Sequence, residues 1–230
     1  YNNEELEATI AAALAEGCKR FDLFFMIGLP EQTYESVMET VEYCGQLMER
    51  FNTGGTPRLF PFISPFAPFL DPGSEVFNDP ERYGYKLLWR SLEEHRQALV
   101  QPSWKHVLNY ETRWMNRDEI ANATYEAGLR FNQLKLKYGL IGEQQAAATE
   151  ERIRRAIRLM GRIDEILAEP DEKMRAELLL AIKGQVDDAN ISTVCDKREL
   201  EAQISGLWKI NFFRGVQVAL SEMWRGLRRN

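Results

Sequence analysis

The chain has 230 residues, a formal net charge of -6, 44% hydrophobic residues and 28% charged residues, a composition typical of a globular protein with a substantial core. The acidic balance argues against a protein that binds nucleic acid over its whole surface, because such proteins are usually basic. No apolar run approaches the roughly 18 residues that span a membrane, and the opening YNNEELEATI lacks the basic and apolar regions of a signal peptide. We therefore expect a cytoplasmic protein, and the opening Tyr1 suggests a fragment of a longer one.

The three cysteines, Cys18, Cys44 and Cys195, are odd in number and far apart in the sequence. This usage is typical of a reducing compartment and provides no disulfide framework. It also provides no metal site, because no two of the thiols lie within one helical turn. We expect free, buried thiols at all three positions.

The first 64 residues alternate between helical and strand patterns. NEELEATIAAALAE places apolar residues four apart and predicts a helix that stops at Gly17. FDLFFMI is almost continuously apolar and predicts a parallel strand covered on both faces, and Thr33 can then cap a helix. RLFPFIS predicts a second strand with Pro61 at a sheet edge or a bulge. The expected elements are a helix over 3–16, a strand over 21–27, a helix over 34–50 and a strand over 58–64.

This order predicts a βαβ crossover, in which the two strands pair in parallel. A helix or a neighbouring chain should cover the free edge, because two strands alone make a poor sheet. A long loop rich in proline and glycine follows over 65–84, and helices then dominate, with strands nearly absent. The expected fold class is therefore α/β followed by all-α. The later helices are predicted over 83–100, 116–138, 143–168, 171–189 and 197–227.

The stretch FFMIGLPEQT ends the first strand on Gly28, followed by a proline and polar residues. One explanation is a plain strand-to-helix turn, which the residues alone favour. The other is a backbone that approaches a ligand, since ligands of parallel α/β folds lie beyond the carboxyl ends of the strands. Glycine permits such an approach because it has no side chain.

FFMIGLPEQT, with ETVEYCGQL behind it, resembles the fifth strand and following turn of radical S-adenosylmethionine enzymes, where a MIGLPGET-like segment overlaps a loose GxIxGxxE pattern. ELEATIAAALAEGCKRF resembles the run into that strand, and FPFISPFAPFLDPGS resembles the sixth strand with its loop. The chain is most similar to proteins that join an N-terminal cobalamin-binding domain to the radical domain, most strongly over 20–125. The resemblance implies the last βα units of a partial (β/α) barrel over 1–70 and a helical C-terminal domain over 71–230.

The same resemblance implies sites for S-adenosylmethionine. Met26 would contact the adenine beside Gly28, Glu31 stands at the acidic position of the motif, and Phe62 and Ile63 would lie near the adenine edge. The chain departs from the motif at two positions: Phe24 replaces its first glycine, and Glu31 replaces the usual glycine of GLPG. We expect the strand tip at Gly28 to be bare and to face a cofactor cavity.

The family's four-iron four-sulfur (4Fe-4S) cluster needs a CxxxCxxC loop, and the associated domain supplies histidine to cobalamin from a D-x-H-x-x-G signature. Neither motif occurs in this sequence, so the resemblance places both in a missing N-terminal portion, the expected partner. The chain alone should hold no metal and no catalytic residue and should be inactive. The complete protein would cleave S-adenosylmethionine reductively and act on a small-molecule substrate, by methyl transfer if cobalamin takes part. The alternative is a non-catalytic helical protein-interaction module.

Three further segments each allow two interpretations. PSWKHVLNYETRWMNRDE mixes indoles with polar groups, so it could form a substrate pocket wall or an interhelix connection whose tryptophans plug the core. The arginine-rich helix over 150–167 reads better as a solvated amphipathic helix than as a phosphate site. The aromatic helix over 207–230 favours core or oligomer contacts over membrane contact. The candidate pocket residues are Trp104, His106, Tyr110 and Trp114.

An aromatic and proline cluster follows the second strand. Its rings could stack on a flat cofactor, although packing between the sheet and the helical region is the more ordinary explanation. The cluster consists of Phe60, Pro61, Phe62, Phe66, Pro68 and Phe69.

Overall fold

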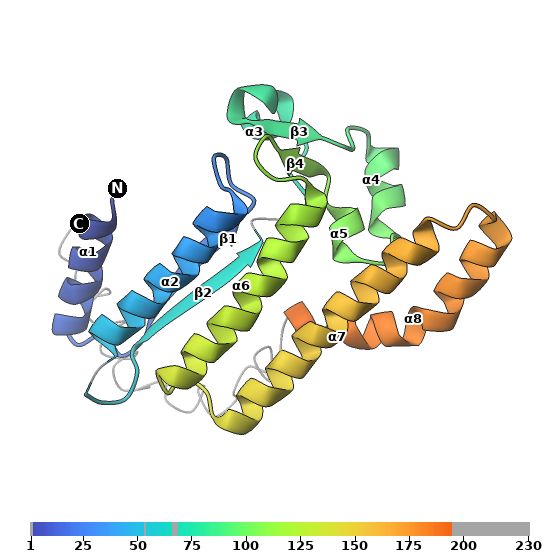
Figure 1. Ribbon diagram of the computed structural model, residues 1–230. Helices are drawn as coiled ribbons and strands as arrows, with labels where there is room; N and C mark the ends of the chain where they lie inside the picture. The colour runs from blue at the N-terminus through green and yellow to red at the C-terminus, as the bar shows by residue number, and fades with distance from the viewer. Residues whose placement is uncertain (1, 53, 66–68, 195–230) are drawn as a thin grey trace, which may run out of the picture. The chain divides into compact units, whose positions relative to one another are not determined.

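The computed structural model describes residues 2–52, 54–65 and 69–194 and contains mixed α/β structure that is mostly helical (Figure 1). The chain divides into two compact units, Tyr1–Ala189 and Asn190–Asn230, and every element below belongs to the first unit except the end of the last helix. The first elements are α1 (Asn3–Ala15), β1 (Phe21–Ile27), α2 (Tyr34–Phe51), β2 (Leu59–Pro65) and the short α3 (Glu75–Asn78). The later elements are η1 (Glu81–Tyr83), β3 (Tyr85–Leu87), α4 (Leu92–Leu99), α5 (Trp104–Val107), β4 (Tyr110–Thr112), α6 (Arg117–Lys137), α7 (Glu143–Leu167) and α8 (Glu172–Val194).

β1 and β2 pair in parallel around α2, which confirms the predicted crossover. Phe21 lies opposite Leu59, and the Phe21 amide donates to the Arg58 carbonyl at 2.7 Å. A residue of a strand directs its N–H and C=O to the same edge, and successive residues alternate. The odd-numbered residues of β1 therefore bond to β2, and its even-numbered residues direct their backbone groups away from β2.

The two faces of this sheet differ. Ile10 and Leu14 of α1 and Leu47 of α2 pack with Leu59, and the partly buried odd-numbered side chains of β1 join that cluster. The even-numbered side chains point the other way, and Phe24 is 66% exposed. The prediction that β1 is covered on both faces is therefore wrong: among the described residues, helices cover one face only.

α6 lies alongside β2 and contacts both β2 and α2 (Figure 1). Pro61 opposes Leu23, so it belongs to the residues of β2 that face away from β1, where the missing N–H costs no ladder bond. These observations agree with the predicted edge position of Pro61 and with a helix beside the sheet.

The segment that follows the long loop is not the helix predicted over 83–100. Gly84 adopts φ 77°, which ends η1, and Ser91 starts α4 with a capping box to Glu94. Between them, Tyr85–Leu87 pairs antiparallel with Tyr110–Thr112, a hairpin that was not predicted, although helices dominate this part as expected. Turn geometry at Gly84 and a new cap at Ser91 override the helical pattern.

The remaining helices follow the sequence closely. Thr33 caps α2, Asn116 caps α6 through a capping box, and Gly17 follows α1 with φ 89°. α7 buries its apolar stripe, while Arg154 pairs with Glu150 in solvent, as expected for an amphipathic helix. The predicted helix over 197–227, Cys195, Phe66 and Pro68 lie outside the described residues.

The main core joins residues from both sides of position 70. It contains Ile27 and Val37 together with Leu108, Tyr110 and Ile120. The division into parts 1–70 and 71–230 remains a prediction. None of the helices within the described ranges is long and apolar enough to cross a membrane.

Candidate functional site

The strand tip at Gly28 is closed by the chain's own side chains. Gly28 is buried with φ 91°, and a Cβ there would stand 2.8 Å from the Tyr110 hydroxyl oxygen. The Tyr85 hydroxyl donates to the Gly28 carbonyl at 3.2 Å, and burial raises the pKa of Tyr85 to about 12. Position 28 thus requires glycine because another group lies close to its backbone. That group is the Tyr110 side chain and not a ligand, so the expectation of a bare tip is wrong.

The Gln32 side chain shapes the turn beyond the tip. Its Oε1 accepts from the Gly28 and Leu29 amides at 2.9 and 3.1 Å, and its Nε2 donates to the Met26 carbonyl at 2.9 Å. Met26 and Gly28 are even-numbered, so the amide caps the edge of β1 that faces away from β2. One side chain therefore satisfies three backbone groups where the strand ends.

Glu31 lies in the same turn, exposed and with φ 64°. The left-handed region costs an L-residue energy that glycine does not incur. Its backbone conformation is the one that a glycine at this position of the motif would adopt freely. The Glu31 carboxylate makes no ion pair within the described residues.

The open face of the sheet is the main apolar surface near the tip. The rings of Phe24 and Phe62 stack with centroids 5.2 Å apart and an interplanar angle of 16°. Met26 is 42% exposed on the same face, and the Lys135 ammonium lies 4.8 Å from the Phe62 ring centroid. The open face, defined by Phe24, Met26 and Phe62, is thus an apolar surface on which the two rings stack on each other and the Lys135 ammonium lies over the Phe62 ring.

The structure divides the predicted cofactor residues among four places. Met26 and Phe62 share the open face, whereas Ile63 points to the opposite face and packs against the main core. Gly28 is buried under Tyr110, and Glu31 is exposed in the turn. Only Met26 and Phe62 are brought together on an accessible surface.

The four predicted pocket residues do not converge. Tyr110 lies in the core over Gly28, and Trp114 packs against Gly84 at the end of the β3–β4 hairpin. The Trp104 indole donates to the Tyr125 hydroxyl at 2.9 Å. His106 alone borders a cavity, so these residues act mainly as the interhelix connection that the sequence also allowed.

That cavity, of about 420 Å³, lies among α5, α6 and α7. The buried Lys105 ammonium donates to Asp118 at 2.7 Å and to Asp164 at 2.6 Å, and this contact lowers the pKa of Asp118. Burial and then Lys105 lower the pKa of His106, although Asp164 lies 3.4 Å from its Nε2. Because Lys105 already pairs with Asp164, the attraction between Asp164 and a protonated His106 is smaller than the effect of burial on the His106 pKa. These charges pair with one another, and the cluster joins three helices.

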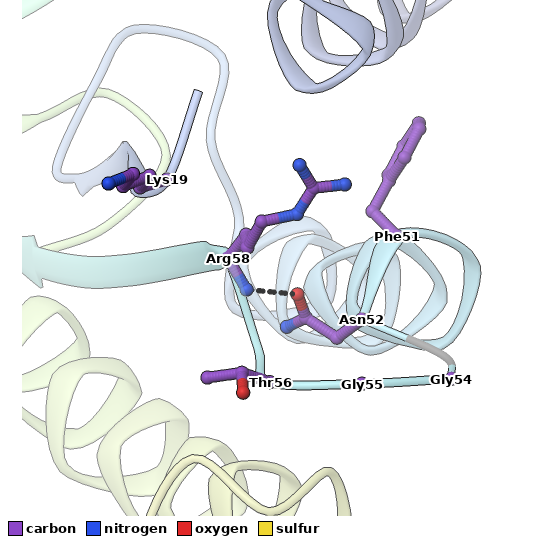
Figure 2. A pocket seen from close by; sticks show the side chains of 7 residues that line it. All are labelled: Lys19, Phe51, Asn52, Gly54, Gly55, Thr56 and Arg58. Carbon is purple, nitrogen blue, oxygen red and sulfur yellow. Dashed lines mark hydrogen bonds between the residues drawn. The ribbon is translucent and has the colours of Figure 1, made fainter. Parts of the chain in front are cut away.

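A second cavity, of about 460 Å³, lies at the amino ends of the strands (Figure 2). Asn52 Oδ1 accepts from the Arg58 and Leu59 amides at 3.0 and 2.9 Å, and Asn52 Nδ2 donates to the Leu59 carbonyl at 2.8 Å. The Arg58 guanidinium donates to the Leu14 carbonyl at the end of α1. The polar groups are thus used to join α1, α2 and β2, at the end of the sheet opposite to Gly28.

The described thiols provide no cluster site. Cys44 is buried in α2, and burial raises its pKa to about 12, whereas Cys18 donates to the Arg20 carbonyl. Among the described residues no group of three or more His, Cys, Asp or Glu side chains could hold a metal ion. An iron–sulfur cluster therefore does not fit the described part of this chain.

Two residues that were not chosen as site residues from the sequence organise the site. Gln32 caps the tip, and the buried Asn109 amide accepts from the Leu70 N–H at 2.7 Å and donates to the Leu70 carbonyl at 3.1 Å. Asn109 therefore ties the loop beyond β2 to the hairpin. A polar residue within PSWKHVLNYETRW, between apolar neighbours, was the available signal for Asn109. No comparable sequence signal identified Gln32, apart from its position in the turn.

Comparison with known proteins adds no relative: no protein-family model, no curated protein and no solved structure matches this chain.

Proposed function

We propose that this chain is the C-terminal part of a radical S-adenosylmethionine enzyme of the cobalamin-associated type, and that its open face helps to seat S-adenosylmethionine. The single observation that carries the proposal is the open face itself. A parallel strand pair covered by helices on one side leaves Phe24 and Met26 exposed and Phe62 half-buried on the other. In a (β/α) barrel the helices lie outside and the bare face points inward, so β1 and β2 would be two strands of a partial barrel.

The open face suits a flat heterocycle. Phe24, which is 66% exposed, offers an aromatic ring, and a base stacked on an aromatic side chain gains about 1–3 kcal/mol. The exposed Met26 thioether adds a soft, adaptable contact on the same face. When bound, S-adenosylmethionine would supply the radical chemistry after reductive cleavage by a cluster that another part of the protein holds. The residues of this chain would position the adenine and exclude water from it.

The helical region would close one end of the barrel and shape the pocket for a small-molecule substrate. The β3–β4 hairpin already covers the strand tip through Tyr85 and Tyr110. Any substrate would therefore meet the open face rather than Gly28. This chain without its N-terminal partner would bind neither cluster nor cobalamin and would not catalyse.

The test is binding and cleavage of S-adenosylmethionine by the longer protein, reconstituted with iron and sulfide. Phe24→Ala should weaken S-adenosylmethionine binding by about 10-fold or more, as expected for loss of one stacking partner. The matched control is Phe25→Leu, one residue along β1 but on the covered face, which should leave affinity unchanged. No visible cluster absorbance and no reductive cleavage in the unmodified protein would reject the proposal, as would equal affinities of the two variants.

A second candidate is a non-catalytic module that recruits a partner protein. One observation favours it: α4 and the residue after it expose three apolar side chains, Leu92 (87%), Leu99 (62%) and Val100 (79%). Scattered exposed leucines are common, whereas three on one short helix are typical of a contact surface. A Leu92→Asp, Leu99→Asp variant that retains cleavage of S-adenosylmethionine but loses a partner would show that both functions coexist.

A further inference from the structure

We propose that the cavity at the amino ends of β1 and β2 binds the phosphoryl group of a small phosphate monoester, through Lys19 and the free edge of the Arg58 guanidinium. The cavity, of about 460 Å³, is large enough for such a molecule. Lys19 precedes β1 and Arg58 precedes β2, so the site lies at the end of the sheet opposite to Gly28. The inference is therefore independent of the proposed function.

The Arg58 guanidinium is held on one side and free on the other. Its Nη1 donates to the Leu14 carbonyl at 3.0 Å and to the Cys18 carbonyl at 3.4 Å. Its Nε and Nη2 have no hydrogen-bond partner among the described residues. These two nitrogens form one edge of the planar group, and such an edge binds two oxygens of a phosphate or a carboxylate through parallel hydrogen bonds. The backbone contacts therefore orient Arg58 for an oxyanion.

The lining of the cavity is positively charged. None of the described residues that line it is acidic, and neither Lys19 nor Arg58 forms an ion pair with a described carboxylate. α1 and α2 both end near the cavity, and each helix end carries about half a negative charge. Two full positive charges exceed the charge of these helix ends, so the cavity attracts an anion. A phosphate monoester, with up to about two negative charges, fits it better than a carboxylate.

The loop over 54–56 leaves space for the ligand. A Cβ at Gly54 or Gly55 would meet no atom within 4 Å, so the loop borders open space. The Thr56 hydroxyl lines the same cavity and can donate to a phosphate oxygen. Figure 2 shows the Phe51 ring and the Arg58 side chain extending in the same direction from their backbones. The organic group of the ester would therefore contact an aromatic ring while Arg58 holds the phosphoryl group.

Titration of the 230-residue chain with phenyl phosphate, followed by the chemical shifts of the backbone amides, tests the inference. The shifts should saturate at Gly54, Gly55 and Thr56 and leave Gly28 unchanged. Phenyl phosphate should bind about 10-fold more tightly than benzoate, which has the same ring but a smaller charge. It should also bind about 3-fold more tightly than inorganic phosphate, which has no ring to contact Phe51.

A matched pair of variants at Gly55 changes the charge of the lining and keeps the fold. Gly55 does not adopt a positive φ, and a side chain there would extend into open space. Gly55→Glu should weaken phenyl phosphate binding by about 10-fold or more, because the new carboxylate repels the anion. Gly55→Gln has the same size without the charge and should change the affinity by less than about 2-fold.

Variants of the two cations test their separate roles. Arg58→Lys keeps the charge but loses the two-nitrogen edge, and should weaken phenyl phosphate binding by about 10-fold. Lys19→Gln should weaken it by about 5-fold through loss of one charge. Lys173→Gln, the same change at an exposed lysine of α8, is the control and should leave the affinity unchanged.

The opposite results would overturn the inference. Equal affinities of Gly55→Glu and Gly55→Gln would place the phosphate elsewhere, and equal effects of Lys19→Gln and Lys173→Gln would reduce binding to the general surface charge. Benzoate that binds as tightly as phenyl phosphate would make the ligand a carboxylate, and inorganic phosphate that does so would remove Phe51 from the site. Shifts that do not saturate by about 10 mM would mean that the cavity binds no phosphate monoester.

Discussion

The two faces of the β1–β2 sheet have similar apolar composition and opposite environments. On the covered face, Leu59 and Ile27 are fully buried against helices, whereas on the open face Phe24 is 66% exposed. Burial of a large apolar side chain is worth about 1.5–3 kcal/mol, so the covered face stabilises the fold and the open face does not. An aromatic side chain that does not stabilise the fold is available for binding.

The largest expected effect compares one residue from each face. Ile27→Ala should lower the free energy of unfolding by about 3 kcal/mol, because it leaves a cavity in the core. Phe24→Ala should lower it by less than about 1 kcal/mol, since only the stack with Phe62 is lost. Urea unfolding of both variants measures the difference. Equal losses would mean that the open face is packed in solution.

The strand tip should behave like the covered face. Gly28→Ala should destabilise the protein by about 2 kcal/mol, because φ is 91° and the new Cβ would meet the Tyr110 hydroxyl. Adding Tyr110→Phe removes that hydroxyl and should recover part of the loss, while Tyr110→Phe alone is the control. A double-mutant cycle from thermal unfolding gives the coupling. Zero coupling would show that Tyr110 does not cover the tip.

A smaller effect concerns His106 on the helical side, which is largely buried beside Lys105, whereas Phe24 on the open face is exposed. The lowered pKa of His106 means that the unfolded state takes up a proton first as pH falls. The contribution of neutral His106 to stability is therefore present above pH 6.5, the pKa of histidine in the unfolded state. It is lost as pH falls through the pKa of His106 in the folded state.

Unfolding free energies at about pH 7.5 and about pH 5.5 should therefore decrease at the lower pH, and His106→Asn should reduce that decrease. A decrease of the same size in the His106 variant would assign the pH dependence to other groups.

The smallest effect lies in the turn beyond the tip. Glu31→Gly should raise the free energy of unfolding by about 0.5 kcal/mol, because relief of the left-handed strain exceeds the entropy cost of glycine. Glu31→Ala keeps the strain and should give no gain. A higher midpoint of thermal unfolding for the alanine variant would exclude strain as the cause.

Much of the fold could be predicted from local signals. Thr33 and Gly17 mark helix ends, and the apolar runs around α2 mark two parallel strands. These signals act within a few residues of themselves, so one sequence is enough to find them. The hairpin was missed because Tyr85–Leu87 is short and pairs with a segment 25 residues away in its register, Lys86 with Glu111.

The candidate site was less predictable for a physical reason. Apart from Asp22, FDLFFMI is apolar at both odd and even positions, so the pattern gives only a weak indication of which face is covered. The closure of Gly28 depends on Tyr110, which is distant in sequence and reaches the tip only through tertiary packing. A glycine that admits a ligand and one that admits a tyrosine have the same sequence signature.

The exposure of Met26 gives the open face a chemical reporter. Met26 is 42% exposed, whereas Met48 in α2 is fully buried, and methionine oxidation to the sulfoxide follows solvent access. Mild peroxide should therefore add an oxygen at Met26 well before Met48, detectable by peptide mass. A molecule that binds to the open face, whether adenine or polypeptide, will slow the oxidation of Met26 and so show that it covers this surface.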